Sequence, residues 1–481
     1  MARESFFMQQ RTQTFIFGAF MAALSIGLFY VSEPMSPPQL DATRYADYAL
    51  NIFDHGIFGL TGNQREVKPA PGNANSPLYP AFVALSMWLD PGFADSIRCE
   101  LSGHISKHHS GAGQCTKSYG VITALQLTLA ALAVMCIWLT TQRLFARLSV
   151  SWLASILVVA TTKTNFFAHQ LLTENLVLLF FALMLLFITL VLQTNQKRWW
   201  GLLGTTVGLL TLSRPEYLYL LFAFLLLSIG LGCFFRDRQY WLRNSIFALA
   251  AIIVLSPWVM RNHAHFGHYT LTGGYGDKTI AYRVAYNRMS QQEWRAAFIY
   301  WLPGYGEILA SKYLPAASYK KLGTDPASYL YKEGTEIFDK GLLAVDGDRK
   351  KLTGYLIKTE ILDRPVAHFL ASVPLAWRGV LSGKYLAIVG LPCFIFLLFY
   401  ALRNKHYLIL ALCFPATVLI AFYAAVSVSI PRYNIYLIYY YGIASAWFLT
   451  SAVELIRKKF SPTSERTDNT AAAQIKPENT T

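Results

Sequence analysis

Residues 171–193 read LLTENLVLLFFALMLLFITLVLQ, and this stretch decides the class of fold. Glu174, near its start, is the only ionisable residue in the stretch. The rest of the run matches the roughly 20 residues that a helix needs to cross the hydrocarbon core of a bilayer. The stretch therefore predicts a helix that spans a membrane.

The composition extends this prediction to much of the chain. Of the 481 residues, 54% are hydrophobic and only 14% are charged, which departs strongly from an ordinary soluble domain. We therefore expect an all-α polytopic membrane protein with about ten transmembrane helices. The ten predicted spans are residues 12–32, 117–142, 150–166, 171–193, 199–213, 216–235, 245–260, 382–402, 407–427 and 434–456.

Short basic segments predict the orientation of these spans. If the N-terminus lies in the cytoplasm, alternation of sides places five short basic segments inside, as the positive-inside rule requires. Residues 33–116 and 261–381 then form two long outer loops, and residues 461–481 form a disordered cytoplasmic tail. The five inside segments contain Arg143 and Arg147; Lys197 and Arg198; Arg236, Arg238 and Arg243; Arg403 and Lys405; and Arg457, Lys458 and Lys459.

The net charge of +15 is explained by this topology. Because the basic residues are scattered over short loops rather than gathered on one soluble face, membrane lipids are expected partners and nucleic acid is not. Residues 1–460 are predicted to form a single integral membrane domain. The outer loops are predicted to contain amphipathic helices within residues 291–314 and 351–380, and a membrane-hugging helix within residues 76–89.

The first outer loop contains the acid of greatest interest, Asp41. A predicted helix over residues 42–54 has two faces, so it would lie along a membrane surface. Asp41 precedes this helix, where a carboxylate can either cap the first turn or point into a cleft at the lipid boundary. One face would present Tyr45, Tyr48, Ala49, Ile52 and Phe53, and the other Arg44, Asp47, Asn51 and Asp54.

Ionisable residues gather at the outer ends of the predicted spans. Because such groups are costly at membrane depth, a cluster of them predicts a functional site. Carboxylates together with arginines suit a substrate that carries a phosphate and a hydroxyl to be deprotonated, since the planar guanidinium matches phosphate oxygens. The residues are Asp41, Lys163, His169, Glu174, Arg214, Glu216, Arg261 and Arg432.

Two of the six cysteines, Cys99 and Cys115, lie in the first outer loop. If that loop is outside the cytosol, a disulfide between them is expected. The same segment contains His104, His108 and His109, but the spacing matches no standard zinc pattern. We therefore predict a disulfide here and no cofactor, with a divalent metal as the alternative.

Seven motifs follow one another along the predicted outer side. They are Asp41-Ala-Thr-Arg-Tyr45, His55-Gly56, Ser76-Pro77-Leu78-Tyr79-Pro80, Thr173-Glu174, Ser213-Arg214-Pro215-Glu216, Pro257-Trp258-Val259-Met260-Arg261-Asn262 with Phe266-Gly267, and Pro431-Arg432-Tyr433. This order resembles the bacterial membrane glycosyltransferases of the GT-C superfamily, such as the protein O-mannosyltransferases and the aminoarabinose transferase acting on lipid A. The resemblance covers about residues 12–456.

The resemblance implies an inverting glycosyltransferase, transferring a hexose or a pentose, with its active site on the periplasmic face of the bacterial inner membrane. It implies a polyprenyl-phosphate sugar donor and a lipid, glycan or protein acceptor of the cell envelope, for example lipopolysaccharide. Asp41 would be the general base. Protein O-mannosyltransferases carry an acidic pair at this point, whereas Asp41 is followed by Ala42, so the acceptor stays open. The residues expected to bind substrate or donor phosphate are Arg214, Arg261, Arg432, Lys163, Tyr45 and Glu174.

Other interpretations stay open at this stage. A transporter or flippase of lipid-linked sugars, or an O-antigen polymerase or ligase, would also have many spans and arginines. Transporters place charges near the midplane of repeated halves, whereas this chain has its charges at one face and no detectable repeat. Asp41 could be a helix cap, Glu174 could neutralise a helix dipole, and the arginines could be interfacial anchors.

Overall fold

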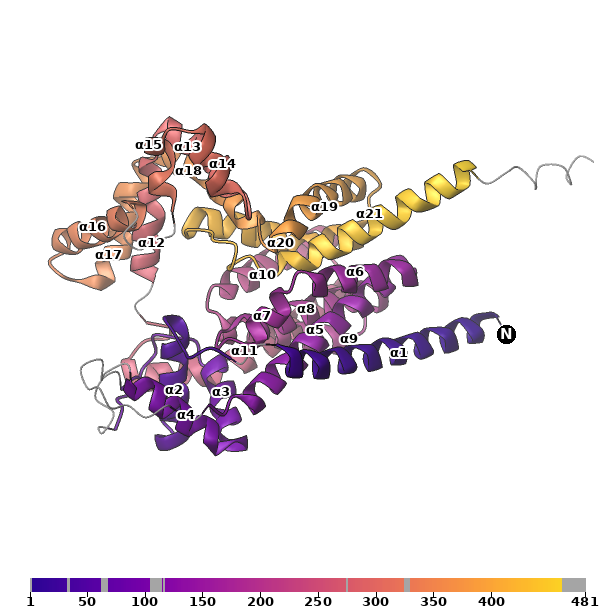
Figure 1. Ribbon diagram of the computed structural model, residues 1–481, viewed down its shortest axis with the longest axis horizontal. Coiled ribbons are helices and arrows are strands. Elements are labelled where there is room, and N and C mark those ends of the chain that lie inside the picture. The colour runs from indigo at the N-terminus through magenta and orange to yellow at the C-terminus, as the bar shows by residue number, and fades with distance from the viewer. Residues whose placement is uncertain are drawn as a thin grey trace, which may run out of the picture.

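Helices account for every regular element in the part of the chain that the structure describes. The computed structural model describes residues 2–32, 35–61, 68–103, 115, 117–273, 276–323 and 329–460 (Figure 1). The prediction of an all-α fold is confirmed over these residues. The predicted tail and the three histidines of the possible zinc segment lie outside them.

Seven helices of the described residues are long and apolar enough to cross a membrane, and each falls on a predicted span. The other three predicted spans fall on α6 (Leu148–Ala160), α9 (Lys197–Ser213) and α21 (Leu437–Phe460). At 13 and 17 residues, α6 and α9 are shorter than a full span, and α21 carries a basic last turn. The seven are α1 (Ala2–Val31), α5 (Gly120–Phe145), α8 (Glu174–Thr194), α10 (Tyr217–Phe235), α11 (Arg238–Phe266), α19 (Tyr385–Arg403) and α20 (Tyr407–Val426).

Helix α8 occupies the centre of the bundle, packed against α5, α9 and α20. It also meets the start of α21, where Phe181 stacks on Tyr436, the residue before that helix, at 4.5 Å between ring centroids. Helix α9 approaches α11 closely at Gly204, because glycine has no Cβ atom. A Cβ atom at this position would lie 2.1 Å from the carbonyl oxygen of Phe247. This packing brings the start of α8 and the end of α9 to the same outer end of the bundle.

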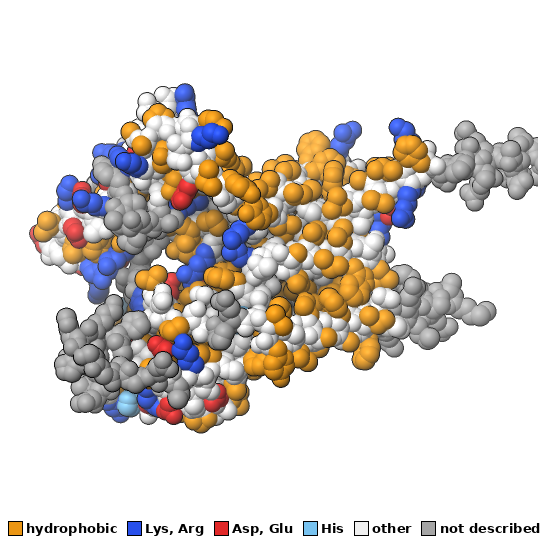
Figure 2. Space-filling view, in the orientation of Figure 1, with side chains coloured by type: hydrophobic (Ala, Val, Ile, Leu, Met, Phe, Trp, Pro, Cys, Tyr) orange, Lys and Arg blue, Asp and Glu red, His pale blue; other side chains and the backbone are white. Residues whose placement is uncertain are grey.

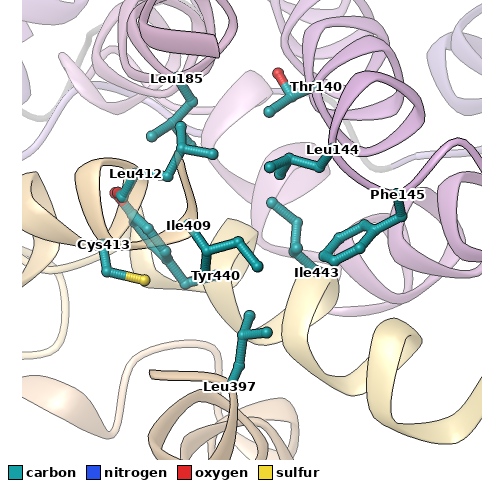
Figure 3. Close-up of a pocket in the computed structure, with 10 residues that line it drawn as sticks. All are labelled: Thr140, Leu144, Phe145, Leu185, Leu397, Ile409, Leu412, Cys413, Tyr440 and Ile443. Atoms are coloured by element: carbon teal, nitrogen blue, oxygen red, sulfur yellow. The ribbon is translucent and has the colours of Figure 1, made fainter. Parts of the chain in front are cut away.

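The interior of the bundle leaves little empty space. A void of about 20 Å³ between α5, α8, α19, α20 and α21 is lined mainly by apolar side chains such as Leu185 and Ile443 (Figure 3). This is room for about one water molecule. The bundle interior therefore offers no ligand site at this position.

The first outer loop folds into α2 (Asp41–His55), α3 (Leu78–Leu89) and α4 (Pro91–Gly103), called here the first lobe (Figure 1). Tyr79, Val83 and Met87 of α3 are fully buried and belong to the same hydrophobic cluster as the spans. Cys99 and Cys115 form a disulfide, with their Cα atoms 5.7 Å apart.

One expectation about α2 is wrong. Asp47 and Asn51, predicted to lie on its water-facing side, are buried. The chain after α2 folds back over them: the Thr61 hydroxyl donates to Asp47 at 2.8 Å, and the Asn51 amide donates to the Gly59 carbonyl at 2.8 Å. Because the returning chain satisfies these polar groups, the polar face of α2 packs against protein rather than water.

The second outer loop forms a separate second lobe at the same end of the spans (Figure 1). The predicted helical stretch 291–314 is interrupted at residues 301–305, where Gly304 has a positive φ of 81°. The lobe has two small hydrophobic cores, one of which also includes Ala424 of α20 and Val428. It consists of α12 (Gly276–Ala285), the 3-10 helix η1 (Tyr286–Arg288), α13 (Gln291–Tyr300), α14 (Gly306–Tyr313), α15 (Ala316–Tyr319), the 3-10 helix η2 (Lys320–Leu322), α16 (Tyr329–Ala344), α17 (Arg349–Leu356), the π-helix η3 (Ile357–Leu362) and α18 (Pro365–Val380).

Buried Arg283 joins the second lobe to the outer end of α20, and buried Arg378 joins parts of the lobe to one another. Arg283 of α12 donates through Nε to the Ala424 carbonyl at 2.7 Å, and through Nη2 to the His368 carbonyl at 3.0 Å. Arg378 of α18 donates to the Tyr286 hydroxyl at 3.1 Å and lies over the ring of Trp301. The lobe is therefore attached to α20 both through the hydrogen bonds of Arg283 and through apolar packing of α18 against Ala424 and Val428.

Candidate functional site

The site is built around Glu174, the first residue of α8. An acid is favoured at a helix N-terminus, and the central position of α8 makes Glu174 fully buried. Its Oε1 atom accepts a short hydrogen bond from Nε of Arg432 and lies 3.7 Å from Nη1 of Arg214. Its Oε2 atom has no hydrogen-bond partner among the described residues. Glu174 is thus a buried negative charge that two arginines share.

Arg214 follows the last residue of α9 and turns into this cluster. Its guanidinium pairs with Glu216 at 2.7 Å and lies 5.1 Å from the ring centroid of Tyr433. The hydroxyl of Tyr423 donates to the same Glu216 oxygen at 3.3 Å. Burial lowers the pKa of Arg214. The neighbouring carboxylates raise it by more than burial lowers it, so the pKa lies above its usual value. Arg214 is therefore a fixed cation.

Arg432 connects the buried acid with an exposed one. Its Nη1 atom lies 3.3 Å from Oδ2 of Asp41, whose side chain is 55% exposed, whereas that of Glu174 is 0% exposed. Burial lowers the pKa of Arg432 and Glu174 raises it, with a net upward shift. One cation thus contacts a carboxylate that substrate can reach and a carboxylate that it cannot.

The alternative of Asp41 as a helix cap is wrong. Asp41 is the first residue of α2, and the capping position belongs to Leu40, with no side-chain hydrogen bond to the first turn. Leu40 has a positive φ of 51°, which is uncommon for a residue with a side chain. Strained positions of this kind cluster at functional sites. The Asp41 side chain is turned toward Arg432 instead of its own helix.

Tyr45 lies one turn along α2 from Asp41 and faces the same cluster. Its ring packs edge-on against Tyr79 at 5.3 Å. Burial raises the pKa of Tyr45 to about 12, so the phenol stays neutral and can donate a hydrogen bond. Below it, the Tyr79 hydroxyl donates to Gln126 at 3.1 Å, and Gln126 donates to the Ala168 carbonyl at 3.1 Å. This network supports the turn that leads into α8.

Three predicted site residues lie elsewhere. Arg261 is ringed by Phe58, Trp258 and Phe266, and it donates to the carbonyls of Gly72 and Phe58 at 2.6 and 3.0 Å. It therefore fastens the first lobe to α11. Lys163 lies over the ring of Phe166. His169 hydrogen-bonds through Nδ1 to the carbonyl of Asn165 at 2.9 Å.

A cavity of about 710 Å³ adjoins the cluster. Arg214, Glu216 and Tyr433 form its charged end. Figure 2 shows Lys and Arg side chains gathered between the two lobes. The rest of the wall is apolar on the side of the membrane helices, with Leu218, Leu255, Val259, Phe422 and Val426, and carries hydroxyls elsewhere, with Thr270, Thr272, Thr279, Thr353 and Ser427.

Sequence reasoning missed Tyr423 and Gln126 as supporting residues. Both lie inside apolar helices, and each acts through a partner from a distant part of the chain. Tyr433 was visible only as the end of the Pro431-Arg432-Tyr433 motif. No local pattern marks Tyr423, because aromatic residues are common in apolar helices of this chain.

Residues 116–260 match the sequence model of the family described as dolichyl-phosphate-mannose-protein mannosyltransferase. This segment contains Glu174, Arg214 and Glu216 but neither Asp41 nor Arg432. The match supports the predicted resemblance to GT-C membrane glycosyltransferases. No curated protein matches the chain in sequence.

Several solved structures are similar to this chain. One is ArnT from Cupriavidus metallidurans bound to undecaprenyl phosphate, at 14% identity and TM-score 0.39, covering 92% of this chain and 81% of that one. Another is the oligosaccharyltransferase AglB from Archaeoglobus fulgidus with an inhibitory peptide and a dolichol-phosphate, at 12% identity and TM-score 0.47. That alignment covers 98% of this chain and 53% of AglB, so the chain spans about half the length of AglB.

Proposed function

We propose that this chain is a membrane glycosyltransferase that moves a sugar, with inversion, from a polyprenyl-phosphate donor to an acceptor hydroxyl. The observation that carries the proposal is the position of Arg432, joined on one side to buried Glu174 and on the other to exposed Asp41. This arrangement puts a phosphate-binding cation directly beside a base that an acceptor can reach. The family match over residues 116–260, to enzymes named for a dolichyl-phosphate sugar, supports it.

The shape and chemistry of the cavity fit an amphiphilic donor. A lipid-linked sugar has an apolar tail, a charged phosphate and a sugar with many hydroxyls. The cavity has an apolar wall on the membrane helices, Arg214 at one end, and threonine hydroxyls such as those of Thr279 and Thr353 on the second lobe. Its volume of about 710 Å³ falls in the usual range of ligand sites. The donor would place its tail toward the membrane and its sugar toward the second lobe.

The donor phosphate would have to compete with carboxylates for the arginines, and burial decides which pair opens. Exposed ion pairs contribute only about 0–1 kcal/mol, and the Asp41 to Arg432 pair is partly exposed. Breaking a buried pair costs about 3–5 kcal/mol, and Glu174 is fully buried. Phosphate would therefore displace Asp41 from Arg432 and leave Glu174 in place.

Displacement of Asp41 would prepare the chemical step. Asp41 takes the proton of the acceptor hydroxyl while that oxygen forms a bond to the anomeric carbon. The bond from the anomeric carbon to the phosphate oxygen breaks, and its electron pair leaves with the lipid phosphate. Arg432 and Arg214 offset the charge of the leaving group. A single displacement of this kind inverts the anomeric carbon.

The disulfide of the first lobe supports a periplasmic position for the site. The Cys99–Cys115 disulfide belongs to the first lobe, which also supplies Asp41. Disulfides persist in oxidising compartments, so this face would be the periplasmic side of a bacterial inner membrane. Arg214 and Arg432 supply in this scheme the positive charge that a divalent metal would otherwise supply. A lipid, a glycan or a protein remains the proposed class of acceptor, because Asp41 is followed by Ala42.

The test compares cells that lack the protein with cells that carry the native chain, Asp41→Asn or the matched control Asp339→Asn. Asp339 lies on α16 of the second lobe, exposed and far from the cluster. Mass spectrometry of envelope lipids and glycans reads out the sugar that the deletion loses. We expect Asp41→Asn to lower transfer by about 10²–10⁴-fold, the usual contribution of a general base, with donor lipid accumulating and Asp339→Asn unaffected. Normal transfer by Asp41→Asn would overturn the assignment of the base.

A further inference from the structure

The second lobe exposes an apolar stripe along α18. Val366, Phe369, Leu370 and Val373 lie on one face of that helix by their spacing, and they are 69%, 70%, 49% and 40% exposed. Ala371 and Leu375, on the other face, are buried in the core of the lobe. Large apolar side chains exposed together at helical spacing mark a surface that contacts something.

A second exposed apolar surface lies on α14 and continues one of the spans. Tyr305 and Ile308, at the start of α14, are 58% and 62% exposed. The Tyr305 ring lies 6.3 Å from that of Tyr385, the first residue of α19. Tyr385 begins the exposed apolar stripe of α19, which continues with Ile388 and Val389. The outer surface of this span therefore passes without interruption onto α14.

Both halves of α18 are fixed to the outer ends of membrane helices. Arg283 donates both to the His368 carbonyl of α18 and to the Ala424 carbonyl near the end of α20. The Tyr441 hydroxyl, in the second turn of α21, donates to the Val380 carbonyl at the end of α18. Helix α18 thus lies beside the outer ends of the spans rather than far above them.

The residues around these surfaces are those that favour a membrane interface. The indole of Trp294 donates to the Leu370 carbonyl at 2.8 Å, and that of Trp377 donates to the Phe298 carbonyl at 3.0 Å. Tryptophan and tyrosine are enriched at the level of lipid headgroups. Exposed cations flank them, namely Lys312, Arg364 and Lys384, and would attract anionic headgroups.

We propose that the exposed faces of α14 and α18 lie in the headgroup region of the outer leaflet, so that the second lobe is itself a lipid-binding element. This apolar belt consists of Tyr305, Ile308, Val366, Phe369, Leu370 and Val373. Continuity with the lipid-facing stripe of α19 argues for lipid rather than a second copy of the chain. Figure 2 shows hydrophobic side chains at the junction of this lobe with the spans. This proposed lipid contact does not depend on the proposed glycosyltransferase activity.

The test uses single-cysteine reporters in the full chain, in a Cys233→Ser background because Cys233 is the exposed free thiol among the described residues. Phe369→Cys and Ile308→Cys are labelled with an environment-sensitive fluorophore in vesicles of phosphatidylethanolamine and phosphatidylglycerol. The matched control is Leu343→Cys, an apolar residue of α16 that is 79% exposed but remote from the spans. Quenching is measured with lipid-borne nitroxide and with aqueous iodide.

We expect the two belt reporters to be quenched strongly by nitroxide lipids and several-fold less by iodide than the Leu343→Cys control. Quenching by iodide equal to that of the control would overturn the proposal. Protection from both quenchers, together with disulfide-linked dimers of the Phe369→Cys chain, would assign the face to a second copy and would also overturn it. A labelled chain that retains the thermal unfolding midpoint of its parent shows that the substitution has not displaced the lobe.

Discussion

The two outer lobes are attached to the membrane helices in different ways. The first lobe shares one continuous hydrophobic cluster with the spans, through residues such as Tyr79 and Phe93. The second lobe has one core that lies wholly within it and another that includes Ala424 of α20 and Val428, and buried Arg283 adds a hydrogen bond to the Ala424 carbonyl. The first lobe supplies Asp41 and Tyr45 to the site, whereas the second supplies only part of the cavity wall.

The two modes of attachment suit the different parts that the lobes take in the proposed reaction. Helix α2 packs into the hydrophobic cluster of the spans through Ala42 and Ala46, which holds the backbone of Asp41 in place beside Arg432, as the proposed catalytic role requires. The second lobe meets the bundle through the core that it shares with α20 and through the hydrogen bonds of Arg283. Burial lowers the pKa of Arg283 to about 10, so its guanidinium stays charged, and it is held by carbonyls, an amide oxygen and a hydroxyl rather than by a carboxylate.

The largest effect on stability and activity is expected for substitutions where the first lobe and the spans meet. Arg432→Gln leaves Glu174 buried without its closest cation, so we expect a loss of about 3 kcal/mol in the free energy of unfolding as well as loss of transfer. The measurement is thermal unfolding in detergent. In the double variant Glu174→Gln with Arg432→Gln, stability should recover partly while activity does not. Equal destabilisation of single and double variants would show that the pair is not coupled.

Arg283→Met should loosen the second lobe and leave the first intact. Its guanidinium makes four hydrogen bonds, of which three join α12 to α18 and α20 and one reaches Asn287 of η1, and unpaired buried groups cost about 1–3 kcal/mol each. Hydrogen exchange should rise within residues 276–380 and stay unchanged in α2 and α3. Arg288→Met, which removes only an exposed pair with Glu360, is the control. Faster exchange in both lobes would contradict independent attachment.

Acid should loosen the second lobe as well. Burial, and then the charge of Arg283, lower the pKa of His368 from 6.5 to about 4. Because the detached lobe binds this proton more readily than the attached one, stability is lost as pH falls from about 6.5 toward 4 and is constant above that window. Hydrogen exchange across α18 at pH 7 and pH 5 measures this. In His368→Gln the difference between the two pH values should shrink.

The smallest effect concerns the support beneath the first lobe. Tyr79→Phe removes the hydroxyl that donates to Gln126 and should cost about 1 kcal/mol of unfolding free energy. Because the ring still packs against Tyr45, transfer should persist. A drop in transfer as large as that of Asp41→Asn would mean that this hydroxyl takes part in the reaction.

The sequence was informative about depth in the membrane. Ionisable residues at span ends are costly, so sorting them by depth predicted Asp41, Glu174, Arg214 and Arg432, which the structure brings together. The position of each of these residues around the bundle axis could not be predicted, because it depends on how closely the helices pack, as at Gly204 of α9 against α11. Arg261 therefore has the predicted depth but lies away from the cluster.

The packing of α2 could not be predicted for a related reason. Its two-faced pattern was correct, but the pattern does not say whether water or chain covers the polar face. The cover comes from Gly59 and Thr61, in a segment without regular structure. Likewise, Tyr423 joins the site only because α20 ends beside Glu216.

Arg432 meets Glu174 across 258 residues of chain and Asp41 across 391. At synthesis rates of roughly 5–20 residues per second, Glu174 waits roughly 10–50 s for this partner, with Arg214 as its earlier neighbour. A ribosome that stops short of Arg432 releases a chain whose central helix begins with a poorly compensated carboxylate. The ion pair of Glu174 and the contact with Asp41 therefore form only after residue 432 has been synthesised, so one late residue completes both the packing of the central helix and the cluster.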